Sequence, residues 1–177
     1  MAQIGLKNLY YSVMTIGDNG TESYGTPVKI GEAISVDINP SFDKVSLYGD
    51  DMAVATDISM KEVEVTIETT DIPLKDQAAL LGHSYSESDG LTANMTDSAP
   101  YVALLFESEK HSGGIRCVKL MKGKFAPTQE TINTKGESLE YQVPSLTGTF
   151  VADKSGDWKK IKDFAKGAAT ASWYTSV

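Results

Sequence analysis

Residues 58–83, ISMKEVEVTIETTDIPLKDQAALLGH, determine how the rest of the chain folds. Val63, Val65 and Ile67 alternate with acidic and hydroxyl side chains, and this period of two places the apolar set on one face of a strand. Residues 73–81 begin with a proline, carry a short apolar stripe and precede a glycine, a pattern that predicts one short helix. The stretch therefore predicts a strand that leads into a helix packed back on a sheet.

The length and composition are those of a globular protein. The 177 residues fit a single domain over 1–177. No apolar run approaches the roughly 20 residues that a membrane span needs. The N-terminus lacks a basic segment followed by an apolar one, so we expect synthesis in the cytoplasm. A single cysteine, Cys117, excludes an internal disulfide.

The formal net charge is −8, and it is concentrated in the first part of the chain. Residues 1–72 hold four lysines against twelve acidic residues, which gives −8. Residues 73–177 balance, with twelve basic and twelve acidic residues. An acidic surface without basic clusters argues against a protein that binds phosphates, and it suits a surface that must not bind them.

The remaining segments predict further strands around the central one. The β-branched, aromatic or alternating segments are 8–16, 28–38, 100–108, 115–125 and 137–151. Asn39-Pro40 is expected to end the strand at 28–38, and residues 84–98 read as a loop. The predicted fold is mainly β with one or two short helices, arranged as an antiparallel β-sandwich or half-barrel.

Residues 40–57, PSFDKVSLYGDDMAVATD, are too long for an ordinary connection between strands. They carry too many apolar side chains for a solvated linker, chiefly Phe42, Val45, Leu47, Tyr48 and Met52. One interpretation is a hairpin or Ω-loop folded on its own domain. The other is an arm that buries these side chains on another subunit.

Residues 157–166, DWKKIKDFAK, predict a second helix within a C-terminal helix or arm at 155–177. Trp158, Ile161 and Phe164 fall on one face at helical spacing, so we expect them to pack on the sheet or on a neighbour.

The sequence offers no catalytic or metal-binding constellation. His83 follows a glycine that ends a helix and His111 lies in a turn, so both are expected to be exposed rather than metal ligands. Cys117 lies inside a strand and is expected to be buried. Phosphate-binding loops, GxSxG elbows, dinucleotide fingerprints and calcium loops are absent. Glu62 and Glu64 share a face of an open strand, which is typical of a solvated surface rather than of acid/base catalysis.

The order of the segments resembles the major tail proteins of long-tailed bacteriophages, in particular the phi-thirteen type. The resemblance covers nearly the full length. It rests on GLKNLYYSVM at 5–14, VKIGEAISVDINP at 28–40, LYGDDMAVATD at 47–57, the strand and helix at 61–82, and GGIRCVKLMKGKF at 113–125.

The resemblance implies a structural virion protein with no enzymatic activity and no cofactor. Such proteins form hexameric rings that stack into a hollow tail tube, through which double-stranded DNA passes without specific binding. The expected partners are further copies and the tape measure, tail terminator and distal tail proteins. A long early loop, here 40–57, contacts neighbouring subunits or rings. The protein would be made in the host cytoplasm and reside in the virion tail.

The acidic set Glu62, Glu64 and Glu68 must face away from the core, because the intervening residues are apolar. In a tube this face is either the lumen or the outer surface, and we expect the lumen. Two other classes remain open: a ligand-binding β-barrel of the lipocalin or streptavidin type, and a ring-forming component of a contractile or type VI-like apparatus.

Overall fold

The computed structural model describes residues 3–49, 52–128 and 143–177. The strands are β1 (Gln3–Ile16), β2 (Glu22–Tyr24), β3 (Val28–Lys29), β4 (Ala33–Gly49), β5 (Met52–Thr69), β6 (Ser84–Ser86), β7 (Gly90–Thr92), β8 (Val102–Lys110), β9 (Ile115–Ala126), β10 (Ser145–Val151) and β11 (Lys159–Phe164). The described residues also form one α-helix, α1 (Leu74–Leu81), and one 3-10 helix, η1 (Ala171–Tyr174).

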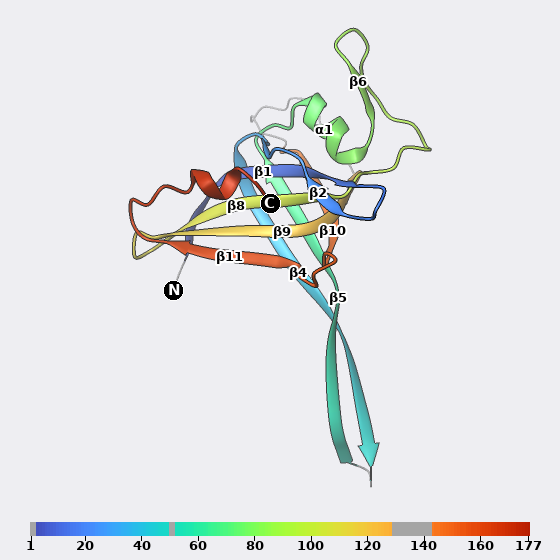
Figure 1. Cartoon of the computed structure of the whole chain (residues 1–177), viewed down its shortest axis with the longest axis vertical. Coiled ribbons are helices and arrows are strands. Elements are labelled where there is room, and N and C mark those ends of the chain that lie inside the picture. Colours follow the sequence, from blue (N-terminus) through green and yellow to red (C-terminus); the bar gives the residue numbers. More distant parts are fainter. Residues whose placement is uncertain (1–2, 50–51, 129–142) are drawn as a thin grey trace, which may run out of the picture.

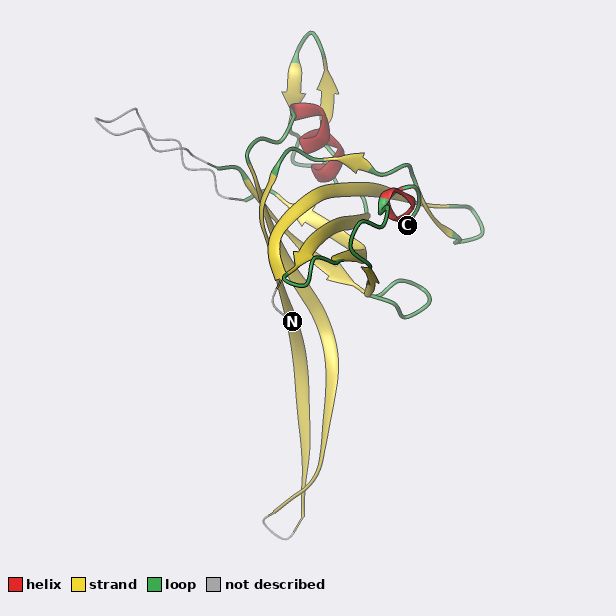
Figure 2. Cartoon of the chain, turned by 90° about the vertical axis from the view of Figure 1, so that its left-hand side faces the viewer, coloured by secondary structure: helices red, strands yellow, loops and turns green. Residues whose placement is uncertain are grey.

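Nine of these strands form one antiparallel sheet, in the order β2-β1-β8-β9-β10-β5-β4, with β3 beside β1 and β11 beside β9. The sheet is strongly curved but open, and the long β4–β5 hairpin extends far beyond it (Figures 1 and 2). The predicted antiparallel β fold of the half-barrel type with a short helix is therefore confirmed.

The core lies on one face of this curved sheet. Val63, Val65 and Ile67 are fully buried, as their alternation predicts. They pack with side chains from β8, β9 and β10, including Phe150 and Leu146. Burial of such side chains is the main source of stability in a domain of this size.

Helix α1 covers part of the core through Leu80 and Leu81. It ends where Gly82 adopts a φ of 75°, and the backbone carbonyl of Ser98 would lie 2.3 Å from a Cβ at that position. Only glycine meets both requirements without strain. The hydroxyl of Tyr11 donates to Asp76 at 2.9 Å and ties the helix to β1.

Several strand boundaries differ from the sequence-based prediction: β1 begins at Gln3 rather than at residue 8, and the strand predicted at 28–38 is divided between β3 and β4. β4 does not end at Asn39-Pro40 but continues to Gly49. It is paired only with β5 in the described sheet, and a proline is tolerated in an edge strand because its missing N–H can face solvent. The predicted loop at 84–98 contains the β6–β7 hairpin.

The predicted second helix at 157–166 is wrong, because this segment forms β11. Residues 115–120 of β9 pair with β8 on one side, and β11 supplies hydrogen bonds on the other. The backbone N–H and C=O groups of β9 need hydrogen-bond partners on that side. Pairing with β9 therefore favours a strand at 159–164, although the apolar residues have helical spacing. Arg116 donates to Asp163 through Nε at 2.8 Å and through Nη2 at 3.0 Å, and Lys110 pairs with the same carboxylate.

The strand conformation also changes how the predicted helix residues are placed. Alternation puts Ile161 and Phe164 on opposite faces, and Ile161 is 52% exposed. Phe164 packs edge to face on Trp173 with ring centroids 6.3 Å apart, while Trp158 is partly buried against the core.

The predicted strand at 137–151 corresponds to β10 from Ser145 onward. Its part at 137–142 lies outside the described residues. In the part of the chain that the structure describes, no helix has the length and apolar character needed to cross a membrane.

Candidate assembly arm and channel face

The distal part of the β4–β5 hairpin, residues 41–49 and 52–62, forms an arm. Strand β10 pairs with β5 only from Val63 to Glu68. Beyond Val63, β4 and β5 pair only with each other among the described strands. The arm therefore leaves the body as a two-stranded ribbon, and α1 and the β6–β7 hairpin lie at the opposite end of the molecule (Figure 1).

The arm exposes the apolar residues that the sequence singled out. Phe42 is 55% exposed and Tyr48 is 71% exposed. Five other large apolar side chains of the arm are exposed to a similar extent, namely Val45, Leu47, Met52, Val54 and Ile58, whereas Met60 is partly buried against the core. The described part of residues 40–57 forms a hairpin, as the first interpretation expected, but most of its large apolar side chains are not packed on the rest of the described domain. Whether these side chains contact a neighbouring subunit stays a prediction.

An isolated ribbon of this kind is intrinsically marginal. A two-stranded hairpin buries little apolar surface and leaves two unpaired edges. The arm holds together through cross-strand hydrogen bonds, and bulges at Lys61 and Val54 shift its register. A covering surface would remove both its exposed apolar area and its open edges from water.

The second candidate surface is the polar face of β4, β5 and β10, opposite the core. Cross-strand register places Glu64 between Asn39 and Thr149. The hydroxyls of Thr66 and Thr147 lie 3.1 Å apart in the adjacent row. We name this surface the acidic face and define it by Asp37, Glu62, Glu64, Thr66 and Glu68 on β4–β5, with Thr147 and Thr149 on β10.

The structure thus brings the three predicted lumen residues together. Glu62 and Glu64 are exposed. Glu68 is half-buried, and its carboxylate accepts a hydrogen bond from Ser35 at 2.9 Å. Asp37, which the sequence analysis did not single out, adds a fourth carboxylate. The alternation of polar residues at 35, 37 and 39 is the signal that could have identified it.

Two lysines lie at the β9 border of the acidic face, and each contacts a neighbouring side chain. Lys124 follows Thr149 in the row of Glu64, and its Nζ lies 4.5 Å from the ring centroid of Tyr101. Lys122 pairs with Glu22 at 2.6 Å. None of the carboxylates of the acidic face takes part in an ion pair among the described residues. Lys124 keeps its positive charge in the cation–π contact, so the acidic face carries net negative charge with a cation at its border.

The C-terminal segment covers the other face of β1, β8 and β9. Glu107 is buried and accepts hydrogen bonds from Asn8 at 2.6 Å and from the Tyr174 hydroxyl at 3.1 Å. Burial and this carboxylate raise the pKa of Tyr174. Lys119 lies 4.3 Å from the ring centroid of Trp173, and burial lowers its pKa. These long-range contacts had no counterpart in the sequence pattern.

Cys117 is buried beside this cluster, as the sequence predicted. Burial and the Glu107 carboxylate raise the pKa of its thiol to about 11. At neutral pH the thiol stays protonated, so it is a poor nucleophile.

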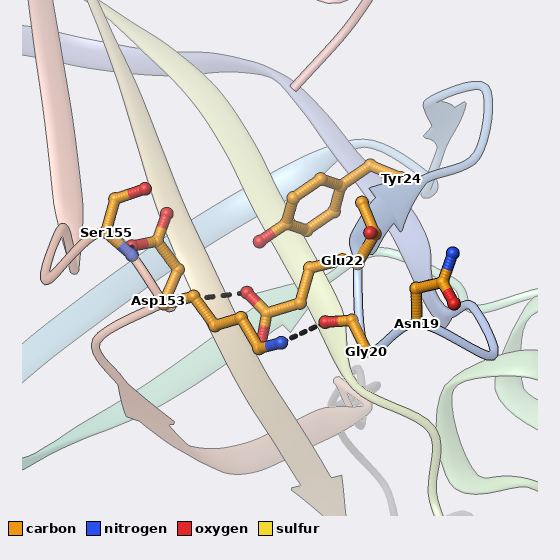
Figure 3. Close-up of a pocket in the computed structure, with 8 residues that line it drawn as sticks. Asn19, Gly20, Glu22, Tyr24, Asp153 and Ser155 are labelled. Carbon is orange, nitrogen blue, oxygen red and sulfur yellow. Dashed lines mark hydrogen bonds between the residues drawn. The ribbon is translucent and has the colours of Figure 1, made fainter.

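A cavity of about 360 Å³ lies between the β1–β2 turn and the loop after β10 (Figure 3). Glu22 accepts a hydrogen bond from the backbone N–H of Lys154 at 3.2 Å, and the Lys154 ammonium donates to the carbonyl of Gly20. Burial and the carboxylates of Asp153 and Glu22 raise the pKa of Tyr24 to about 12. The groups that line this cavity chiefly tie the two loops together.

The two histidines differ in their exposure to solvent. His111 is exposed, as predicted. The same prediction is wrong for His83, whose side chain is only 11% exposed and whose Nδ1 lies 2.8 Å from Asp97. The backbone N–H of Asn94 and the His83 ring lower the pKa of Asp97. The described residues contain no group of three or more candidate metal ligands.

The exposed apolar arm of this open β fold is typical of a protein–protein interaction surface. Comparison with protein families agrees: residues 37–173 match the model of the phage tail tube protein family. The match spans most of the chain, and the chain belongs to this family. No curated protein matches the sequence.

Proposed function

We propose that copies of this protein assemble into hexameric rings that stack into the hollow tube of a phage tail, through which double-stranded DNA passes. This proposal rests chiefly on the arm, an apolar ribbon that no other described segment covers, in a member of the tail tube family. Exposed apolar patches of this extent mark interaction sites.

In this proposal Phe42, Val45, Leu47, Tyr48 and Met52 contact neighbouring copies. Burying an apolar side chain of this size contributes about 1.5–3 kcal/mol. Because each copy carries the same residues, the contribution repeats at every contact along the tube.

The acidic face lines the channel in the same proposal. Lysines in a channel would pair with DNA phosphates and release counterions, which would turn a conduit into a binding site. Carboxylates repel phosphates over roughly a Debye length, about 8 Å at physiological salt. Repeated around each ring, Glu62, Glu64 and Glu68 would form a continuous negative wall.

The role is structural, without catalysis or a cofactor. The other partners are the proteins that set the length of the tube and close its two ends, namely the tape measure, tail terminator and distal tail proteins. The assembled protein resides in the virion tail after synthesis in the host cytoplasm.

The test replaces the arm and measures assembly. Pro40 and Val63 are cross-strand partners, so a two-residue Asn-Gly turn can join them in place of residues 41–62. We expect the wild type to form rings and tubes by negative-stain electron microscopy, and the shortened protein to stay a folded monomer by circular dichroism and size-exclusion chromatography.

A matched control shortens another exposed hairpin, replacing residues 87–89 between β6 and β7 with Asn-Gly, and should still assemble. The proposal fails if the wild type remains monomeric at high concentration, both alone and when seeded with purified tail-tip complexes. It also fails if the protein without its arm builds normal tubes.

A further inference from the structure

The arm is apolar on both faces of its ribbon. Side chains alternate between faces along each strand, and cross-strand partners share a face. Phe42 pairs with Met60, and Lys44 pairs with Ile58. On the opposite face, Val45 pairs with Asp57, and Leu47 follows two residues later.

These faces can be named by their charged residues. The lysine face comprises Phe42, Lys44, Tyr48 and Ile58. The aspartate face comprises Asp43, Val45, Leu47, Met52 and Asp57. These apolar residues are 55–71% exposed, whereas Met60, the cross-strand partner of Phe42, is partly buried against the core. None of the ion pairs among the described residues involves Lys44, Asp43 or Asp57.

A ribbon that lies against a single surface requires one apolar face, and its other face is polar. The part of β5 next to the body follows that rule, since Val63 and Val65 face the core and Glu64 and Thr66 face away. The arm departs from it within the same two strands. Two apolar faces require two covering surfaces.

We propose that arms of successive copies stack face to face, the lysine face of one on the aspartate face of the next. The charges of the two faces are opposite, so each contact brings Lys44 of one copy toward Asp43 and Asp57 of another. Identical ribbons match in length, and paired sheets pack about 10 Å apart. This inference rests on the proposed tube function.

In such a stack both apolar faces of an arm are covered by neighbouring arms, so neither face remains exposed to solvent. The two contacting faces differ, so the interface is heterologous and leaves a free face at each end of any stack. An arm dimer through two identical faces would instead repel through like charges. A stack of arms that does not close into a ring can therefore keep adding copies, as a growing tube requires.

The test reverses the charge of each face separately. Lys44→Asp makes both faces negative, and Asp43→Lys with Asp57→Lys makes both positive. Each variant alone should raise the critical concentration for tube growth, measured by light scattering and sedimentation, by about fivefold, the upper end for an exposed ion pair. Lys75→Asp, an exposed charge reversal on α1, should leave it unchanged.

Two combinations of these substitutions distinguish arm stacking from burial of the arm against some other surface. An equimolar mixture of the two variants should grow tubes near the wild-type concentration, because opposite faces meet again. The protein carrying all three substitutions should do the same. If neither combination rescues growth, or if each single-face variant assembles like the wild type, stacking is overturned while the tube function stands. Absence of wild-type tubes, seeded or not, refutes the tube function itself.

Discussion

Replacing a leucine with alanine, once in the core and once on the arm, distinguishes a contribution to folding from a contribution to assembly. Leu146 on β10 is 4% exposed and packs in the core cluster, whereas Leu47 on the arm is 66% exposed. Leu146→Ala should lower the free energy of unfolding by roughly 2–5 kcal/mol, because it removes buried methyl groups and leaves a cavity. In a protein of this size, that corresponds to a fall in Tm of about 4–20 °C.

Leu47→Ala should affect assembly instead. Complete burial of a leucine contributes about 1.5–3 kcal/mol, and only a third of Leu47 is out of water in the free subunit. The subunit should therefore lose at most about 1 kcal/mol. The exposed two-thirds would contribute about 1–2 kcal/mol per contact in the tube, so the critical concentration should rise roughly 5- to 30-fold.

Differential scanning calorimetry of the dilute subunit and sedimentation of assembled tubes measure the two effects independently. Leu146→Ala should shift the Tm strongly, and Leu47→Ala should shift chiefly the critical concentration. If Leu47→Ala destabilises the subunit as much as Leu146→Ala does, the arm belongs to the core of its own subunit. That result would refute the reasoning on which both proposals depend.

Two further predictions concern the charged groups. The double substitution Glu62→Lys and Glu64→Lys should still permit tubes but slow DNA ejection from assembled particles. The defect should decrease at high salt, because salt screens the attraction between the lysines and the DNA phosphates. Ejection at the wild-type rate at every salt concentration would contradict the channel assignment. Arg116 and Lys110 hold the pKa of Asp163 below its ordinary value of about 4. The charged carboxylate therefore stabilises the folded state above about pH 4 and this contribution is lost as the pH falls through the lowered pKa. Asp163→Asn should flatten the acid-side decline of the unfolding free energy measured in urea between about pH 6 and about pH 2, and an unchanged slope would show that the ion pair is screened by solvent.

Local pattern accounts for the parts of the fold that the sequence predicts well. The alternation at 63–67 fixes which side chains are buried, since the period of a strand is set by its own backbone geometry. The end of α1 at Gly82 is likewise local, because it depends on one backbone conformation. The carboxylates of the acidic face follow from the same alternation.

The errors arise where distant segments compete for the same residues. Residues 157–166 have helical spacing, yet the unpaired side of β9 makes them a strand. His83 was expected to be exposed, but Asp97, fourteen residues away, folds back to pair with it. Pro40 was expected to end a strand, but the edge position of β4 leaves its missing N–H without consequence.

The sequence by itself determined the apolar and acidic sets of the central strand, the helix that follows it and the unusual apolar content of residues 40–57. Each is a property of neighbouring residues and of backbone periodicity. Only the tertiary structure decided that residues 41–49 and 52–62 leave the body as a ribbon that no other described segment covers. That outcome depends on where β10 stops pairing with β5, and β10 lies about eighty residues further along the chain. Burial is a property of the whole packed sheet, so no local pattern could specify which apolar side chains would remain in water.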